Sequence, residues 1–433
     1  MKHKRFLLVL LSLVASVCML FAFAACGGTE DASSQGLVFE RNEDGKSYSV
    51  TGLGSCRDAE IVFPSKHQGS PVTAIGDSAF NDCTSITSIV IPGSITSIGE
   101  SAFENCSKLA NITISNSVTK IGLRAFRNTA YYYDQSNWKN DVLYLGDYLI
   151  ESYRSISGDI TLKNGISTIG DGAFSSCRNL TGIVIPDSVT SIGANAFSDC
   201  SELANVTIGS GVIEIGNAAF SGCESLESIR IPNSVTSIGY WAFYNCRNLK
   251  SVTIGNNVTE IGNSAFEDCR NLTSIMIPNR VTVIGWRAFE NCSKLTSISI
   301  PDSITSIGMR AFENCSSLTS VTIPNRVTVI ESFLFRNCSS LNSVVIPGSV
   351  TEIGESAFEG CSDLTSIVIP DSVTTIGVYA FQHCYYLTSV TLENLNGWSA
   401  GNTSISSYDL SVSETAARYL TDEYCSSIWK RSK

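Results

Sequence analysis

A repeat of 23 residues runs through most of this 433-residue chain and restricts the folds open to it. The phrase IGxxAFxxC recurs, and its cysteines fall 23 residues apart in two runs. The first run holds Cys83 and Cys106, and the second extends from Cys177 to Cys384. A period held this strictly is typical of a solenoid, in which each repeat supplies one rung and the stacked rungs share a core.

The rung at residues 86–106 shows how one repeat is built. Alternation places Ile89 and Ile91 inward in a short β-strand, which Pro92 ends because it has no N–H for the ladder. Gly99 is expected to supply a turn with positive φ. No single rung can enclose its own apolar side chains, so the unit must repeat to bury them.

Fourteen strand-like segments predict a repeat solenoid of about fourteen rungs, with a parallel β-sheet on its concave side. An open end would expose core and strand edge, so a cap is expected at each end. We assign residues 37–71 to an N-terminal cap, 72–393 to the solenoid and 394–433 to a C-terminal cap. Apolar residues at four-residue steps after Ser411 predict an amphipathic helix in that last segment.

The repeat is clearest where residues 185–193 read IPDSVTSIG, followed by Ala196-Phe197 and Cys200. This pattern resembles the BspA-type leucine-rich repeats of bacterial surface proteins, and the resemblance extends over residues 61–393. It implies a leucine-rich-repeat-like fold for the whole array. It also implies a secreted or cell-surface protein that binds host proteins or other cells, because the family is associated with that role.

The register breaks once, where Thr129 stands in place of a cysteine and an insertion occupies about residues 130–159. Two apolar runs around Gly146-Asp147 predict a tight hairpin there. The insertion is rich in aromatic residues: Tyr131, Tyr132, Tyr133 and Trp138. These side chains could form a binding projection, or the hairpin could patch a degenerate rung while the tyrosines pack on the exposed core.

The first residues have the order of a secretion signal. A basic segment at residues 2–5 and an apolar stretch lead to two alanines directly before Cys26. This order resembles a bacterial lipoprotein signal, which implies that residues 1–25 are removed and that a lipid on Cys26 holds the protein in the membrane at the cell surface. Ordinary signal-peptidase cleavage and an uncleaved membrane anchor are the alternatives.

The predicted mature chain is acidic. The full sequence has a net charge of −11, and removing residues 1–25 takes away three positive charges and no negative ones, which leaves −14. Residues 26–36 are rich in glycine, serine and acidic side chains, as in a flexible tether. A surface of this sign excludes nucleic acid as an electrostatic partner.

Twelve of the sixteen cysteines occupy one position of the repeat. Stacked side chains in such a column point in parallel, which does not supply the geometry of a disulfide. No histidine or second cysteine lies at ligand spacing within a rung, so no metal site is expected. We predict that these cysteines are reduced and fill a small apolar slot.

The sequence contains no motif that indicates catalysis. Phosphate-binding loops, HExxH and GxSxG are absent, and His383 beside Cys384 is expected to be exposed while the thiol is buried. We therefore expect no enzyme activity and no cofactor. Three hypotheses stay open: a surface protein that binds host proteins, other cells or glycans; a structural coat protein without a specific ligand; and a glycan-active enzyme, which the missing carboxylate pair disfavours.

The candidate ligand patch lies at the two positions that follow the glycine of the repeat. Most rungs have small or acidic residues there, but three of the rungs between Tyr240 and Arg326 have aromatic, basic or methionine residues, with Asn263 and Ser264 in the rung between the first two. The candidates are Tyr240, Trp241, Trp286, Arg287, Met309 and Arg310. Aromatic rings beside arginines suit a glycan ring or an acidic partner protein. The alternative is that these side chains only cover the outer wall of the solenoid.

Overall fold

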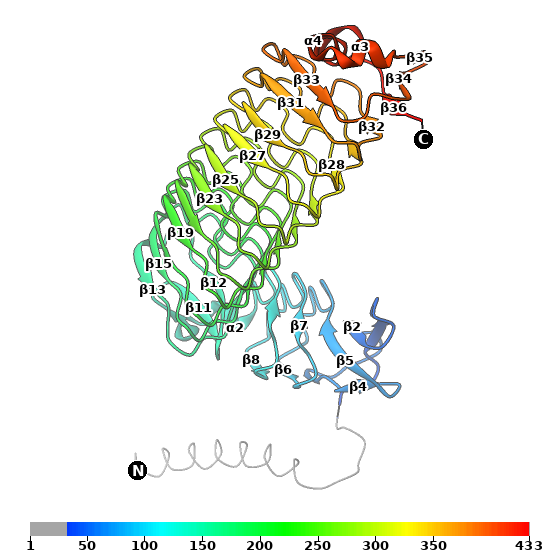
Figure 1. Ribbon diagram of the computed structural model, residues 1–433. Helices are drawn as coiled ribbons and strands as arrows, with labels where there is room; N and C mark the ends of the chain where they lie inside the picture. Colours follow the sequence, from blue (N-terminus) through cyan, green and yellow to red (C-terminus); the bar gives the residue numbers. More distant parts are fainter. Residues whose placement is uncertain (1–32, 433) are drawn as a thin grey trace, which may run out of the picture.

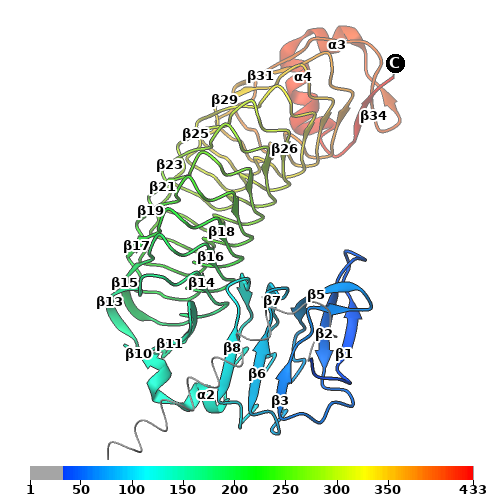
Figure 2. The same cartoon turned by 90° about the horizontal axis from the view of Figure 1, so that it is seen from below.

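The computed structural model describes residues 33–432 as a stack of rungs. Figures 1 and 2 show an elongated, curved body with β1 (Val38–Arg41) near one end and α4 (Ser413–Arg418) at the other. The predicted signal segment, Cys26 and most of the predicted tether lie outside the described residues.

One face of the body is the long-strand sheet, in which equivalent segments of successive rungs run parallel and pair in five separate groups of two to four strands. It has the fourteen strands that the sequence predicts, and Ile89 and Ile91 are buried as expected. Its strands are β3 (Glu60–Val62), β6 (Ser88–Ile91), β8 (Asn111–Ile114), β13 (Ser157–Thr161), β15 (Asn179–Val184), β17 (Asn205–Thr207), β19 (Ser228–Arg230), β21 (Ser251–Thr253), β23 (Ser274–Met276), β25 (Ser297–Ser299), β27 (Ser320–Thr322), β29 (Ser343–Val345), β31 (Ser366–Ile369) and β33 (Ser389–Leu392).

A second face is the short-strand sheet, which the sequence analysis did not predict. Most of its strands have two residues, and Ile238 pairs with Ile261 of the next rung in the same way along the stack. The strands are β5 (Ser70–Ile75), β7 (Ser97–Ile98), β9 (Lys120–Ile121), β14 (Thr168–Ile169), β16 (Ser191–Ile192), β18 (Glu214–Ile215), β20 (Ser237–Ile238), β22 (Glu260–Ile261), β24 (Val283–Ile284), β26 (Ser306–Ile307), β28 (Val329–Ile330), β30 (Glu352–Ile353) and β32 (Thr375–Ile376).

The third face, which we call the turn wall, consists of turns held together by backbone hydrogen bonds between rungs. The N–H of Trp241 donates to the carbonyl of Asn263 (2.9 Å), and the N–H of Phe243 donates to that of Ala265 (2.8 Å). Two positions of every turn have a positive φ: the residue before the column cysteine and the second residue after the repeat glycine. The rung therefore has a triangular outline, with ladders on all three sides.

The repeat glycine has a different role from the one expected. Gly99 does not have a positive φ. Instead, a Cβ at this position would lie 2.5 Å from the backbone N of Asp77 in the preceding rung. Glycine is required because adjacent rungs approach too closely at this corner for any side chain, as at Gly285 beside Asn263.

The core is made of columns of identical side chains. Phenylalanine rings of successive rungs stack nearly parallel, as Phe243 and Phe266 do with centroids 5.3 Å apart. The cysteine column runs beside them, and the Sγ of Cys269 donates a hydrogen bond to the carbonyl of Phe243 at 3.2 Å. All twelve column cysteines are free thiols, and only Cys83 is not fully buried, so the predicted reduced column is present in the structure.

The insertion divides the solenoid into an N-terminal block (residues 37–129) and a main block (residues 157–429), which have separate apolar cores. Its hairpin, β11 (Val142–Leu145) and β12 (Tyr148–Ser152), turns at Gly146-Asp147 as predicted. Val142 and Leu149 pack into the core of the main block, while Leu143 and Tyr148 pack into that of the N-terminal block. Figure 2 shows the two blocks set at an angle, with the insertion between them.

The short-strand sheet has a seam between β26 and β28, where the pairing of neighbouring strands stops and a new sheet begins. Glu331 stands here in the place of the repeat glycine. Gly308 and Gly354 each donate an N–H to the rung before, whereas no such bond forms from Glu331 within the described chain. A Cβ at this corner keeps the two rungs apart, which explains the break.

Caps close both ends of the described chain. At the N-terminus, β1 pairs with β2 (Tyr48–Gly52), and β4 (Lys66–His67) pairs with β5. At the C-terminus the predicted single helix is instead α3 (Ser407–Ser411), α4 and the π-helical turn η3 (Tyr419–Glu423), and Ser406 is the N-cap of α3.

The chain then ends in a strand, not in the helix that the sequence suggested. β36 (Trp429–Arg431) pairs antiparallel with β32 and with β34 (Trp398–Ala400), which also pairs with β35 (Thr403–Ser404). The last rung has a free strand edge, and β36 covers it, which is the physical reason for the change. Over residues 33–432, no helix is long and apolar enough to cross a membrane.

Candidate ligand-binding surface

The candidate patch lies on the turn wall, and its backbone is unusual. The second residue after the repeat glycine has a φ between 51° and 65° in every rung. Several rungs fill this position with serine, asparagine or glycine, which tolerate that conformation. Trp241 (φ 55°), Arg287 (φ 53°) and Arg310 (φ 62°) do not belong to that group. A bulky side chain there costs about 1–2 kcal/mol.

The aromatic residues of the patch are exposed. The side chains of Tyr240, Trp241 and Trp286 have 44%, 47% and 60% of their surface in solvent. Tyr240 and Trp241 meet edge to face with ring centroids 6.4 Å apart. Trp286 lies two rungs further along, and its Cδ1 leans over Gly308 of the following rung. The structure thus places all three on one wall, as the sequence predicted, but the indole of Trp286 points away from the other two.

The basic residues of the patch are already paired. Arg287 Nε lies 3.4 Å from a carboxylate oxygen of Glu290, and an Arg310 guanidinium nitrogen lies 3.1 Å from one of Glu313. Arg310 also lies over the ring of Phe333, 4.5 Å from its centroid. Met309 is half-buried beside them. These contacts leave little positive charge free for an acidic ligand.

A column of carboxylates runs under these arginines, formed by Glu267, Glu290 and Glu313 of successive rungs. Glu267 and Glu313 are buried. Burial, together with the neighbouring carboxylates of Glu313 and Glu267, raises the pKa of Glu290 to about 7. Arg336 joins this carboxylate column to a later rung, because its guanidinium contacts both Glu313 and Glu359. The sequence did not indicate this network because the carboxylates approach one another, and Arg336 reaches Glu313 and Glu359, only through the stacking of different rungs.

The aromatic residues of the insertion mostly pack inside the molecule. In α2 (Ala130–Tyr133), Tyr131 donates a hydrogen bond through its hydroxyl to the carbonyl of Tyr144 (2.7 Å). In β10 (Trp138–Lys139), the Trp138 indole N–H donates to the carbonyl of Tyr132, and η2 (Gln135–Asn137) joins the two elements. Tyr133 alone is largely exposed. This packing favours the interpretation that the insertion covers an open rung.

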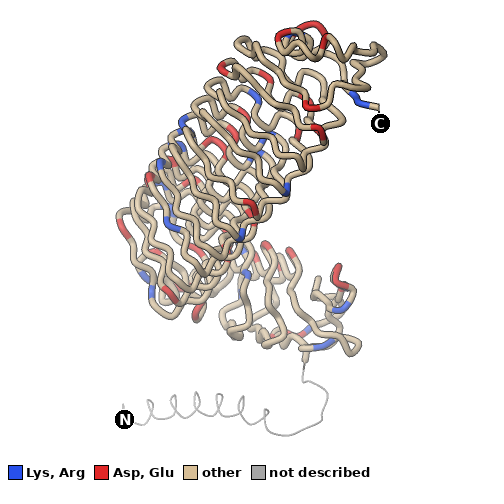
Figure 3. Tube along the Cα trace, in the orientation of Figure 1, with Lys and Arg blue, Asp and Glu red and all other residues tan. Residues whose placement is uncertain are grey.

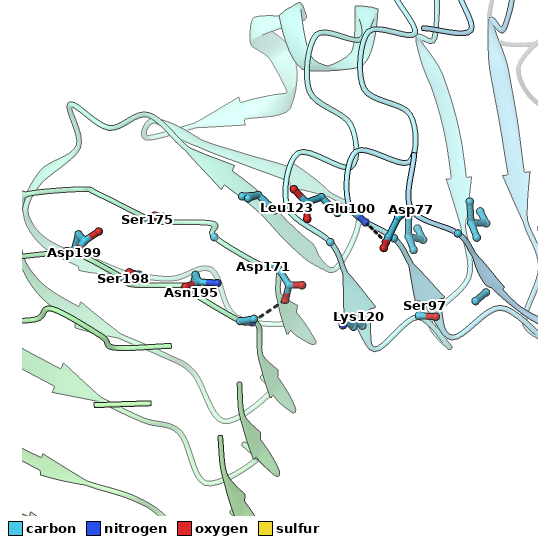
Figure 4. A pocket seen from close by; sticks show the side chains of 18 residues that line it. Asp77, Ser97, Glu100, Lys120, Leu123, Asp171, Ser175, Asn195, Ser198 and Asp199 are labelled. Atoms are coloured by element: carbon cyan, nitrogen blue, oxygen red, sulfur yellow. Dashed lines mark hydrogen bonds between the residues drawn. The ribbon is translucent and has the colours of Figure 1, made fainter. Parts of the chain in front are cut away.

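A cavity of about 680 Å³ lies where the two blocks meet. Figure 4 shows Asp77, Glu100 and Lys120 of the N-terminal block on one side, and Asp171 and Asp199 of the main block on the other. The carboxylates of Asp77 and Asp171 accept backbone N–H bonds from the next rung, at 2.8 and 2.7 Å. The lining is acidic, but among residues 33–432 no group of three or more potential ligands is placed to hold a metal ion.

The remaining chemistry-bearing residues are poorly placed for nucleophilic catalysis. Burial raises the pKa of Cys384 to about 12, and its Sγ donates to the carbonyl of Phe358 at 3.1 Å. His383 is exposed and its Nδ1 faces the hydroxyl of Tyr385 at 3.0 Å. The thiol and the imidazole thus have separate partners, so they do not form an activated pair.

Charge does not single out any other face. Figure 3 shows lysine and arginine interspersed with aspartate and glutamate along the stack. Two further exposed tyrosines, Tyr385 and Tyr386, lie on the last rung at positions that are polar in most other rungs. Sequence analysis did not single them out because it compared only the positions after the repeat glycine.

Comparison with known proteins gives a consistent result. Residues 73–204, 190–319 and 305–415 match the family model described as BspA type leucine rich repeat region (6 copies). A leucine-rich repeat protein of Bacteroides ovatus is 30% identical, over 84% of this chain and 90% of that one, with a TM-score of 0.51.

Two further solved structures are similar over most of their length. A leucine rich cell surface protein of Faecalibacterium prausnitzii is 28% identical, over 90% of this chain and 98% of that one, with a TM-score of 0.39. A leucine-rich repeat protein of Eubacterium ventriosum is 24% identical, over 86% and 97%, with a TM-score of 0.44. No curated protein gives a significant match.

Proposed function

Since this chain belongs to the BspA-type leucine-rich repeat family, we propose that it is a bacterial surface protein whose solenoid presents a binding surface for a host protein, another cell or a glycan. A lipid on Cys26 holds it at the outer face of a membrane. It has no enzymatic activity, and its relatives are repeat proteins.

The observation that carries this proposal is the contrast between inner and outer columns. The buried phenylalanine and cysteine columns hardly change from rung to rung, whereas the pair after the repeat glycine changes in one step from the partly exposed Asn263 and buried Ser264 to the exposed Trp286 and Arg287. A scaffold that repeats inside and varies outside is suited to presenting a specific surface. An enzyme would instead need converging acid, base or nucleophilic groups, and the residues above do not provide them.

A binding screen separates this proposal from a structural coat. The secreted form, starting after Cys26, is immobilised and exposed to host extracellular-matrix proteins, intact host cells and glycans. Saturable binding of at least one of them is expected. A coat protein without a ligand would show no saturable binding, and turnover of a labelled polysaccharide would indicate an enzyme.

A further inference from the structure

We infer that Tyr240, Trp241 and Trp286 form a platform for an uncharged glycan, with the two indoles stacking on sugar rings. This inference rests on the proposed function, because it names the ligand class of that binding surface. We call these three residues the aromatic platform.

The two platform tryptophans differ from the other three in the chain. Trp138, Trp398 and Trp429 are buried, and the indole N–H of each donates to a backbone carbonyl. Within the described residues, the indole N–H groups of Trp241 and Trp286 have no such partner. Each offers an open ring face and a free donor, which is the combination that a hydroxyl-rich, ring-shaped ligand requires.

The backbone conformation at position 241 does not favour a tryptophan. Its position adopts a positive φ that asparagine at the equivalent Asn195 accepts easily. Arg310 and Phe333 share this strained conformation but contact each other. The only ring that Trp241 contacts among the described residues is that of Tyr240, itself exposed. Because no ring contact with a buried residue offsets the strained backbone of Trp241, the strain points to a contact with an external ligand.

The charge around the platform selects an uncharged ligand. Arg287 is paired with Glu290, so it does not attract an anion. Glu260, on the rung between the tryptophans, is exposed and has no ion pair among the described residues. Arg280, on the rung of Trp286, is also exposed and has no ion pair among the described residues, so the free charges on these rungs are of opposite sign and offer an anionic ligand little net attraction.

Spacing is compatible with two sugar rings of one extended chain. Tyr240 and Trp286 belong to rungs whose backbones lie about 10 Å apart at the usual strand spacing, and the Trp286 indole extends further, over Gly308 of the following rung. The rung between them has the short residues Asn263 and Ser264, and the amide oxygen of Asn263 is already used by the N–H of Trp286. A glycan chain can therefore cross this rung without a steric obstacle from a large side chain.

The test uses the fluorescence of the exposed tryptophans. The secreted protein is titrated with neutral gluco-, manno- and galacto-oligosaccharides of graded length, and iodide quenching of tryptophan emission is measured. At least one neutral series should protect the emission in a saturable, salt-independent way. Heparin and a polyglutamate peptide serve as anionic comparators and should not protect.

The variant W241N/W286N gives each position the asparagine that other rungs have there, at Asn195 and Asn263. It should lose glycan binding at least tenfold, measured by calorimetry, while its melting temperature does not fall. Y385S/Y386S removes two other exposed aromatic residues and should bind like the wild type. A lower melting temperature for W241N alone would show that Trp241 supports the wall and would overturn the inference.

Two other outcomes also contradict the platform: no neutral glycan protects the wild type, or the double variant binds as well as the wild type. If the wild type then still binds a host protein or host cells in the screen, the proposed function holds and only the glycan platform fails. If it binds nothing in either assay, both fail.

Discussion

Single residues in this protein are set by backbone demands that repeat every rung. The residue before the column cysteine has a positive φ, and it is Asn, Asp, Ser, Gly or His, as at Asn245, Asp268 and His383. The sequence shows this preference, but its cause could not be found without dihedral angles. The buried cysteine column was predictable because cysteines at the same position of every rung must share one environment, and parallel side chains in a column favour packing over disulfides. The hydrogen bonds from ten of the twelve thiols to phenylalanine carbonyls were not predictable.

Thiol reactivity should depend on folding. Burial raises the pKa of Cys106, Cys200 and Cys246 to about 12, so these groups stay protonated and unreactive at neutral pH. In the secreted form, a thiol reagent should react with the fourteen free cysteines after denaturation without reductant. In the native protein it should react only with the less buried Cys83 and Cys425. Fewer than half of the thiols after denaturation would indicate disulfides.

The carboxylate column predicts a pH dependence of stability. The pKa of Glu290 is raised from 4.5 to about 7, so the folded state binds its proton more tightly than the unfolded state does. Its stabilising contribution is complete below pH 4.5 and is lost as the pH rises through 7. Glu290→Gln should therefore be more stable than the wild type near about pH 8, on the order of 1 kcal/mol, and equal to it in acid.

Thermal melts across this pH range measure the effect. Glu260→Gln changes a carboxylate on an exposed strand position of the neighbouring rung and serves as the control, with no pH-dependent gain expected. A variant at position 290 that stays less stable than the wild type at every pH would show that the ion pair with Arg287 outweighs the burial of the carboxylate.

Secondary-structure elements could be predicted where the alternation of buried and exposed residues along the sequence is regular. The long strands alternate buried and exposed residues, so all fourteen were found, whereas a two-residue strand such as β20 has no alternation to detect. The C-terminal cap was only partly predicted: α4 is helical, but β36 forms because β32 has an open edge, and pairing of that kind depends on the tertiary fold. The platform residues were found because they break the pattern of their columns.

The seam at Glu331 predicts that one substitution can join two sheets. Glu331→Gly removes the Cβ that keeps the rungs apart, so the N–H of residue 331 and that of Thr328 should bond to the rung before, as Gly308 and Thr305 do. Two recovered hydrogen bonds should add about 1–3 kcal/mol to the free energy of unfolding. Hydrogen exchange should slow at the backbone N–H groups of Thr328 and of residue 331.

The reverse substitution is the matched control. Gly285→Ala places a Cβ 2.6 Å from the backbone N of Asn263 in an intact part of the ladder. It should destabilise the protein by about 1–3 kcal/mol and speed up exchange on the rungs beside it. Equal exchange at Thr328 in the wild type and in Glu331→Gly would mean that the glutamate does not cause the seam.

For the whole molecule, the sequence predicted one solenoid whose register is broken by an insertion, and the structure has two blocks with separate cores on either side of that insertion. The angle between them depends on how the hairpin of the insertion packs, with one set of side chains in each core. No periodicity encodes that angle, so the acidic cavity at the junction could not be predicted either. A repeated sequence specifies the contacts between neighbouring rungs. Where the repeat is interrupted, the relative orientation of the two blocks depends on how the inserted side chains pack.

Attachment at one end is the prediction that belongs to the whole molecule. Cells fed an alkyne fatty acid should label the wild-type protein, and Cys26→Ala should be unlabelled and released into the medium. Cys56→Ala, which removes a buried cysteine of the N-terminal cap, should remain labelled. Labelling of Cys26→Ala to the same extent as the wild type would rule out this residue as the attachment site.

The seam also has a mechanical meaning. When a protein fixed at one end is pulled at the other, the inter-rung hydrogen bonds lie along the direction of load and break one rung at a time. The rungs on either side of Glu331 share fewer of these bonds than their neighbours, so unravelling under tension should begin there. Each rung of 23 residues that opens releases about 75 Å of extended chain. The solenoid would then lengthen in steps under a sudden force, and rungs would unfold before the bound ligand dissociates.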